Sequence, residues 1–257
     1  MKIEKITKLK DNKYKLLIDN ENIITYDDVI IENELLYKKT IDAKIYKKIM
    51  SDTLFYEVYN KVVKYIMKRL RSEKEIRQYL LKYELSDSNI EKIITKLKSI
   101  NLINDLAYTK AYINDQIYLS KNGIYKIKDY LINQDIPLDI IENELSNINS
   151  DIMDERLEKI VLKRIRTNKK YSNNELRNRI LKEAITLGYS KEKTLSIIES
   201  NLVEDPNIIE KEYNKLYSKL SNKYSGYELF NRIKQKLYSK GFSVEEINKL
   251  LQNKTED

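Results

Sequence analysis

Apolar residues recur at helical spacing along most of the chain, and this recurrence itself repeats. Ile76, Ile127, Ile180 and Ile233 are apolar anchors separated by intervals of about 50 residues. Each anchor is followed four residues later by an apolar or small residue, and nine residues later by the residue that closes the helix. A fixed period of this length is typical of stacked helical units, so the pattern predicts tandem three-helix repeats.

Capping residues mark where the predicted helices begin and end. Ser72, Ser172 and Ser225 each stand three residues before a glutamate, which is the pattern of a capping box. Gly123 takes the equivalent place in the second repeat, and glycine is tolerated at a helix start. Gly188 and its counterpart in the fourth repeat directly precede the closing aromatic residue, where a left-handed helix end favours glycine.

The first 26 residues follow a different pattern. Alternating apolar residues, interrupted by polar turns at residues 11–13 and 19–22, predict a three-stranded meander. Asp27 or Asp28 is expected to cap a short helix, and a long helix is expected from about Thr40 to about Leu70. The predicted fold is mainly α, with tandem three-helix repeats in an elongated, curved array and a small N-terminal β-meander. The predicted boundaries are 1–41 for the meander and short helix, and 42–104, 105–150, 151–205 and 206–257 for repeats one to four.

Composition removes several kinds of chemistry. The chain has no Cys and no His, which excludes disulfides, thiol nucleophiles, Cys/His zinc sites and imidazole catalysis. It has only 4 Gly, and no glycine-rich phosphate loop. Carboxylate pairs such as Asp27–Asp28 and Glu142 with Glu144 are expected to be solvated, and Asp105 is expected to be an N-cap. We therefore predict no enzyme activity, no cofactor and no metal site, although a Mg²⁺-dependent nuclease or phosphotransferase that uses carboxylates remains the alternative.

The formal net charge of +8 favours polyanionic partners, although the two signs are intermixed along the chain. Basic residues gather where a predicted helix end leads into a cap, and we predict that they contact DNA phosphates or a DNA filament. The alternative is that these cations complement helix dipoles while their stems cover apolar surface. The predicted contact residues are Lys64, Lys68, Arg69, Arg71, Arg77, Lys121, Lys126, Lys163, Arg164, Arg166, Lys169 and Lys170. Tyr125 and Tyr171 lie outside the apolar stripes, so they are the tyrosines expected to be exposed.

Three segments resemble the RecX family of bacterial regulators of the RecA recombinase. The family's Arg-x-x-Ser-x-x-Glu-(Leu/Ile)-Arg signature is matched by Arg69, Ser72, Glu75, Ile76 and Arg77. Residues 101–109 resemble the Gly-Leu-Ile-Asp-Asp-x-x-(Phe/Tyr)-Ala segment, with Asn101, Asn104 and Thr109 as departures at turn, cap and packing positions. Residues 121–127 resemble the Lys-x-Gly-x-x-(Arg/Lys)-Ile segment. The match is clear over residues 59–145, and the N-terminal meander and fourth repeat resemble the longer members of the family.

The resemblance implies a non-enzymatic modulator that binds in the groove of the RecA–DNA filament and limits ATP hydrolysis and strand exchange. Its implied partners are the RecA filament and the phosphates of single- or double-stranded DNA. A cytoplasmic location is expected, because the sequence has neither an apolar leader nor a membrane-length run. A monomer is expected as well. Two other hypotheses remain open: a DNA-binding helical array without a RecA partner, and a scaffold that binds only proteins. A helix-turn-helix reader also remains possible.

Overall fold

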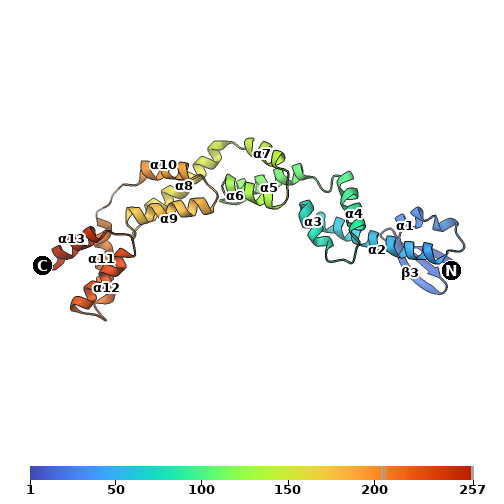
Figure 1. Cartoon of the computed structure of the whole chain (residues 1–257), viewed down its shortest axis with the longest axis horizontal. Helices are drawn as coiled ribbons and strands as arrows, with labels where there is room; N and C mark the ends of the chain where they lie inside the picture. Colours follow the sequence, from blue (N-terminus) through green and yellow to red (C-terminus); the bar gives the residue numbers. More distant parts are fainter. Residues whose placement is uncertain (204, 206, 256–257) are drawn as a thin grey trace. The chain divides into compact units, whose positions relative to one another are not determined.

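The N-terminal residues form the predicted meander. In the computed structural model, which describes residues 1–203, 205 and 207–255, strands β1 (Ile3–Lys8), β2 (Lys13–Ile18) and β3 (Glu21–Tyr26) pair antiparallel in the order β1-β2-β3 (Figure 1). Both turns use Asp-Asn pairs with positive φ, from 46° to 70°, a conformation that these two residue types adopt more readily than most others. Leu16 of β2 faces Ile23 of β3, and both side chains are buried. The predicted β-meander is therefore confirmed.

The sheet packs on the first half of a long helix. After α1 (Asp27–Glu32) and the short 3₁₀ turn η1 (Leu35–Tyr37), helix α2 runs over Ala43–Ile66. Asp42 caps α2, because its side chain accepts a hydrogen bond from the Ile45 amide at 2.7 Å. Ile49 and Tyr56 of α2 share a core with the apolar face of the sheet. Tyr26, not either aspartate, occupies the cap position of α1.

The rest of the described chain is helical, and the helices follow one another in groups of three. Their bounds are α3 (Glu73–Leu80), α4 (Asp87–Ser99), α5 (Asp105–Leu119), α6 (Ile124–Asn133), α7 (Leu138–Ser146), α8 (Ser150–Thr167), α9 (Asn173–Thr186), α10 (Lys191–Asn201), α11 (Asn207–Leu220), α12 (Gly226–Tyr238) and α13 (Val244–Thr255). The four anchors Ile76, Ile127, Ile180 and Ile233 are at most 1% exposed, as the period predicts. Positions 204 and 206, where the third and fourth predicted repeats meet, lie outside the described residues. No helix in the described part of the chain is long and apolar enough to cross a membrane.

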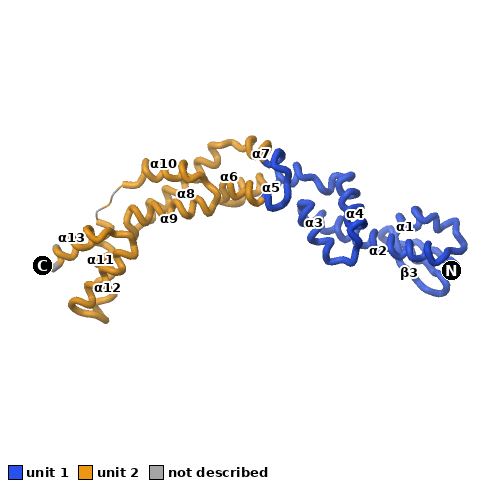
Figure 2. The backbone as a smooth tube through the Cα atoms, in the orientation of Figure 1, with its two compact units in different colours: residues 1–112, 131–141 blue, residues 113–130, 142–257 orange. Residues whose placement is uncertain are grey.

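The chain forms two compact units, residues 1–112 with 131–141 and residues 113–130 with 142–257 (Figure 2). In the first unit, the second half of α2 packs with α3 and α4 around Val58, Val62 and Ile76. In the second unit, α8–α10 enclose a core around Val161 and Ile180, and the core around Ile233 is formed by α11–α13. Each of these helix groups therefore has its own hydrophobic core, as expected of serial repeats.

In the first unit, the start of α3 packs against the end of α6. The Ser72 hydroxyl donates to Gln134 Oε1 at 2.7 Å, and Lys74 Nζ donates to the Asn133 carbonyl at 2.7 Å. Asp135, which follows, has a φ of +60°. This contact joins the first helix group to the end of the next group's middle helix.

The same kind of joint occurs twice in the second unit. The Gly123 amide, at the start of α6, donates to the Leu187 carbonyl at 2.7 Å, just after the end of α9. Ser172, at the start of α9, bonds to the turn after α12, where its amide donates to the Lys240 carbonyl and its hydroxyl to the Gly241 carbonyl. Gly188 and Gly241 have φ values of +85° and +86°, which confirms the predicted left-handed helix ends. At both joints, backbone amides at the start of one helix therefore donate to backbone carbonyls near the end of another.

Only the first predicted capping box in this series is complete. Ser72 Oγ accepts from the Glu75 amide, and the Glu75 carboxylate accepts from the Ser72 amide, each at 3.1 Å. The prediction of a capping box is wrong at Ser172, because its amide bonds to the joint described above. It is also wrong at Ser225, whose side chain makes no cap hydrogen bond.

Candidate nucleic-acid interface

In the first unit, the basic residues nearest the α3 cap are held by a single carboxylate. Glu75 Oε1 accepts from Arg69 Nη2 at 2.6 Å and from Arg71 Nη1 at 3.2 Å. The pKa of Arg69 is raised: partial burial opposes this, but the hydrogen bond and charge of Glu75 outweigh it. The Arg69 side chain remains 54% exposed, so its outer face is still open to a ligand.

Arg71 is a packing residue more than a surface cation. Its side chain is 13% exposed, and its guanidinium lies 4.0 Å from the centre of the Tyr65 ring. Tyr65 in turn stacks on Tyr79 with ring centres 4.3 Å apart. A cation over an aromatic face is favourable. The rings cover most of the Arg71 guanidinium, which the sequence analysis predicted to contact a phosphate.

Arg77 belongs to a salt-bridge network. Its terminal amino groups donate to both oxygens of Glu91, at 2.5 and 3.0 Å, and its Nε donates to Glu73 at 2.7 Å. The hydrogen bond that Arg77 donates to Glu91 is the main reason that the pKa of Arg77 is raised. Burial tends to raise the pKa of Glu73, but hydrogen bonds from Lys98 and Arg77 outweigh this and lower it. Arg77 is therefore occupied within the first helix group.

Two lysines of the same segment, unlike these arginines, are not held by internal contacts among the described residues. Lys64, in the last turn of α2, and Lys68, just beyond its end, are exposed. Neither has an ion-pair partner within the described part of the chain. These two side chains are available to an outside anion.

At the start of α6, the side chains are open while the backbone amides are used. Tyr125 is 58% exposed, as predicted, and Lys121 and Lys126 are exposed without ion pairs among the described residues. The amides of Gly123 and Tyr125, however, donate to the carbonyls of Leu187 and Gly188. A phosphate at this end would therefore meet lysine side chains but not a free helix N-terminus.

The end of α8 carries a second basic cluster. Arg164 forms a two-pronged ion pair with Glu183, at 2.7 and 2.8 Å, and this hydrogen bonding raises the pKa of Arg164. Lys163, Arg166 and Lys169 are exposed and have no ion pair within the described residues.

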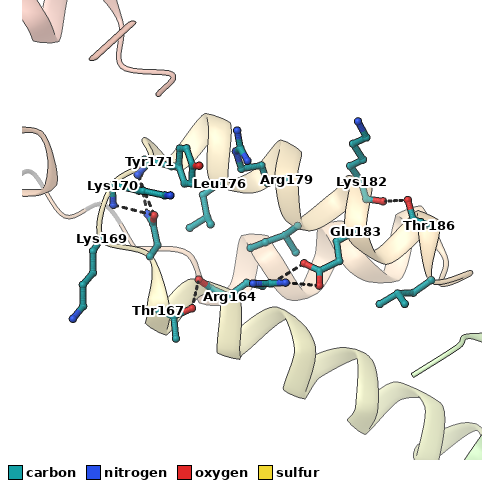
Figure 3. Close-up of a pocket in the computed structure, with 13 residues that line it drawn as sticks. Arg164, Thr167, Lys169, Lys170, Tyr171, Leu176, Arg179, Lys182, Glu183 and Thr186 are labelled. Atoms are coloured by element: carbon teal, nitrogen blue, oxygen red, sulfur yellow. Dashed lines mark hydrogen bonds and ion pairs between the residues drawn. The ribbon is translucent and has the colours of Figure 1, made fainter. Parts of the chain in front are cut away.

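A cavity of about 670 Å³ opens between the end of α8 and helix α9 (Figure 3). Three of the predicted contact residues line it: Arg164, Lys169 and Lys170. Two further cations that the sequence analysis missed, Arg179 and Lys182, line the cavity from α9. The carboxylate in the lining is Glu183, which already pairs with Arg164. Positive charge therefore exceeds negative charge around this cavity.

Arg179 is fixed by two neighbours. Its Nε donates to Glu175 at 2.6 Å, and its guanidinium lies 4.0 Å from the centre of the Tyr171 ring. Lys170 Nζ also lies over this ring, at 4.8 Å. Tyr171 is therefore half-buried by cations, although the sequence predicted an exposed ring.

The same arrangement recurs in the last helix group. Arg232 lies 4.0 Å over Tyr224 and donates to Glu228. Residues 171–179 and 224–232 share the pattern Tyr-Ser-x-x-Glu-Leu-x-Asn-Arg, so this motif could have identified Arg179 from sequence. In residues 71–79 the arginine and tyrosine exchange places, and Tyr65 lies between them.

The carboxylates considered for metal binding do not lie together in one site. Asn104, not Asp105, caps α5, because its Oδ1 accepts from the Ala107 amide at 2.9 Å. Burial is the main cause of the raised pKa of Asp105. Glu142 pairs with Lys128 at 2.9 Å. Among the described residues, no three carboxylates gather where they could hold a metal ion.

Comparison with known proteins agrees with this architecture. The family description "RecX, first three-helix domain" matches residues 59–97, and "RecX, third three-helix domain" matches residues 204–251. The "Regulatory protein RecX" of Streptococcus agalactiae is 32% identical over 98% of this chain and 98% of its own length. That of Streptococcus gordonii is 28% identical over 98% and 99%. A crystal structure of regulatory protein RecX superposes with a TM-score of 0.69, at 22% identity, over 77% of this chain and 98% of the other.

The fold defines a helical-repeat protein with a small N-terminal sheet and basic surface clusters. Similarity over almost the whole length to proteins named as regulators identifies the group more closely. The chain belongs to the RecX family.

Proposed function

We propose that this protein binds the RecA–DNA filament and limits its ATP hydrolysis and strand exchange, without catalysing a reaction itself. The observation that carries this proposal is the 32% identity to "Regulatory protein RecX" over 98% of the chain. The predicted division into four repeats, and action as a monomer in the cytoplasm, are part of the same proposal.

The proposed contacts with filament DNA are the exposed cations of each unit. In the first unit these are Lys64 and Lys68, with the outer face of Arg69. In the second unit they are Lys121, Lys126, Lys163, Arg166, Lys169 and Lys170. A lysine or arginine without an internal ion pair has no such pair to break when it meets a phosphate, and binding gains from counterion release. We propose that Arg71, Arg77 and Arg164 support this surface through their internal pairs.

Sedimentation of RecA filaments assembled on single-stranded DNA tests the binding step. The protein should pellet with the filaments and slow strand exchange in proportion to its occupancy. If it stays in the supernatant at stoichiometric concentration and strand exchange is unchanged, the proposal is wrong.

A second candidate is a DNA-binding helical-repeat protein that needs no RecA. The unpaired cations favour it, because they offer phosphate contacts whatever coats the DNA. Under this alternative, affinity for bare DNA equals or exceeds affinity for the filament and falls steeply with salt. A direct comparison of the two affinities at one salt concentration separates the candidates.

A further inference from the structure

The cavity between α8 and α9 is lined by more positively charged than negatively charged side chains. Arg164, Lys169, Lys170, Arg179 and Lys182 line it, whereas Glu183 is the carboxylate among its lining residues. Its volume of about 670 Å³ lies within the range of ligand-sized pockets, which is about 300–1,000 Å³. An anion of nucleotide size would therefore be both accommodated and attracted.

Arg179 presents an unused binding edge to this cavity. Glu175 takes its Nε and Tyr171 covers one face of the guanidinium. Within the described chain, neither terminal amino group has a hydrogen-bond partner. The two terminal amino groups lie side by side, so they can donate to two oxygens of one phosphate. Because Glu175 and Tyr171 already hold the guanidinium, less side-chain entropy is lost when a ligand binds.

The rest of the lining includes apolar surface. Leu187 is half-buried and contributes apolar surface that solvent can reach, whereas Leu176 and Ile180, also in the lining, are buried in the core of α8–α10. An unpaired base can turn its face to such a surface, whereas the bases of a duplex are stacked and paired. The combination of phosphate donors with the apolar surface of Leu187 therefore favours a single strand.

We propose that this cavity binds one nucleotide of single-stranded DNA. The phosphate lies on the Arg179 fork, with Lys170 and Lys182 beside it, and the base lies against the exposed part of Leu187. Tyr171 and Glu175 are positioning residues, because they orient Arg179 without touching the strand. The inference rests on the proposed function in one respect: the strand it assigns is the DNA of the filament.

The test uses the full chain and a fluorescein-labelled oligothymidylate longer than about 16 nucleotides, followed by anisotropy. Arg179→Gln should weaken binding about tenfold or more, because a charge-assisted contact is lost. The slope of log affinity against log salt should fall by about 0.7, the value for one phosphate on a single strand. The matched control is Arg177→Gln, on the same helix, whose partner is Glu199 at 3.2 Å and which does not line the cavity. It should change affinity by about twofold or less.

Two further variants separate positioning from loss of structure. Tyr171→Leu should weaken binding while leaving the salt slope unchanged, because no phosphate contact is removed. Arg179→Lys should keep the slope and recover only part of the affinity, because the charge remains but the fork is lost. Circular dichroism on each variant shows whether the helices are retained.

Three outcomes would overturn the inference: equal losses in Arg179→Gln and Arg177→Gln, unchanged binding in Arg179→Gln, or equal wild-type affinity for a hairpin duplex. ATP turnover by RecA is measured in parallel on the same preparations. If the wild type leaves turnover unchanged while Arg179→Gln loses the oligonucleotide, the proposed function fails and the cavity assignment stands. If the wild type changes ATP turnover but Arg179→Gln leaves the oligonucleotide affinity unchanged, the cavity assignment is wrong and the proposed function stands.

Discussion

At the scale of single residues, arginine and lysine take different parts in the basic clusters. The side chains of Arg71, Arg77 and Arg164 make several internal contacts each, while those of Lys68 and Lys163 make no ion pair or hydrogen bond within the described chain. A guanidinium presents a planar fork that pairs with carboxylates and stacks on rings, whereas an ammonium is a strongly hydrated point charge. The arginines therefore stabilise the helix groups and leave the lysines exposed to solvent.

Exchanging Arg71 and Lys68 for alanine separates these two roles. Arg71→Ala should lower the free energy of unfolding by about 1–2 kcal/mol, because the stack on Tyr65 and the pair with Glu75 are lost. Lys68→Ala should leave stability unchanged and weaken DNA binding instead. Urea denaturation and DNA anisotropy on both variants provide the check. A stability loss in Lys68→Ala as large as that in Arg71→Ala would contradict this division.

The lowered pKa of Glu73 makes its contribution to stability dependent on pH. Because its folded-state pKa lies below the ordinary value of about 4.3, the stabilisation is fully present above that value. It is lost as the pH falls through the folded-state pKa. Glu73→Gln should therefore reduce the urea midpoint at pH 7 and make little difference in stronger acid. Glu84→Gln, at an exposed site without a described ion pair, is the control and should show no such change.

At the scale of elements, the sequence correctly predicted the features that depend on a local pattern of residues, such as helix periodicity and helix ends. The anchors such as Ile180 are buried because burial follows helical period, and Gly188 is left-handed because few other residues adopt that conformation cheaply. The missing cap at Ser225 and the diverted amide of Ser172 depend on contacts with distant residues, which no local pattern encodes. The motif that ends in Arg179 recurs at residues 224–232 and is readable in the sequence, but the cavity that Arg179 lines forms only when α8 and α9 pack together.

The joints between helix groups predict which glycines tolerate a side chain. A Cβ at Gly188 would lie 2.3 Å from the Lys126 amide nitrogen, and its φ is +85°. Gly226 has a φ of +55° but nothing within 4 Å of such a Cβ. Gly226→Ala should therefore cost only the left-handed conformation, about 1–2 kcal/mol. Gly188→Ala should cost more, because the backbone of the joint must also move. Thermal unfolding of both variants measures the difference, and equal losses would show that the joint does not constrain Gly188.

At the scale of the whole molecule, family membership and surface charge lead to the same account. Similarity to regulators named RecX extends over nearly the full chain, including the small sheet and the last helix group. Each compact unit presents exposed lysines, and the second unit adds a basic cavity. A regulator of a nucleoprotein filament needs polyanion contacts of this kind in addition to contacts with protein.

The most direct test of the central claim is ATP turnover by RecA on single-stranded DNA, titrated with this protein. We predict that turnover falls as the protein approaches stoichiometry with RecA. Neutralising Lys163, Arg166 and Lys169 together should shift the titration to higher concentration, whereas Arg177→Gln should not. If turnover stays constant at stoichiometric wild-type protein, the account of a filament regulator is contradicted.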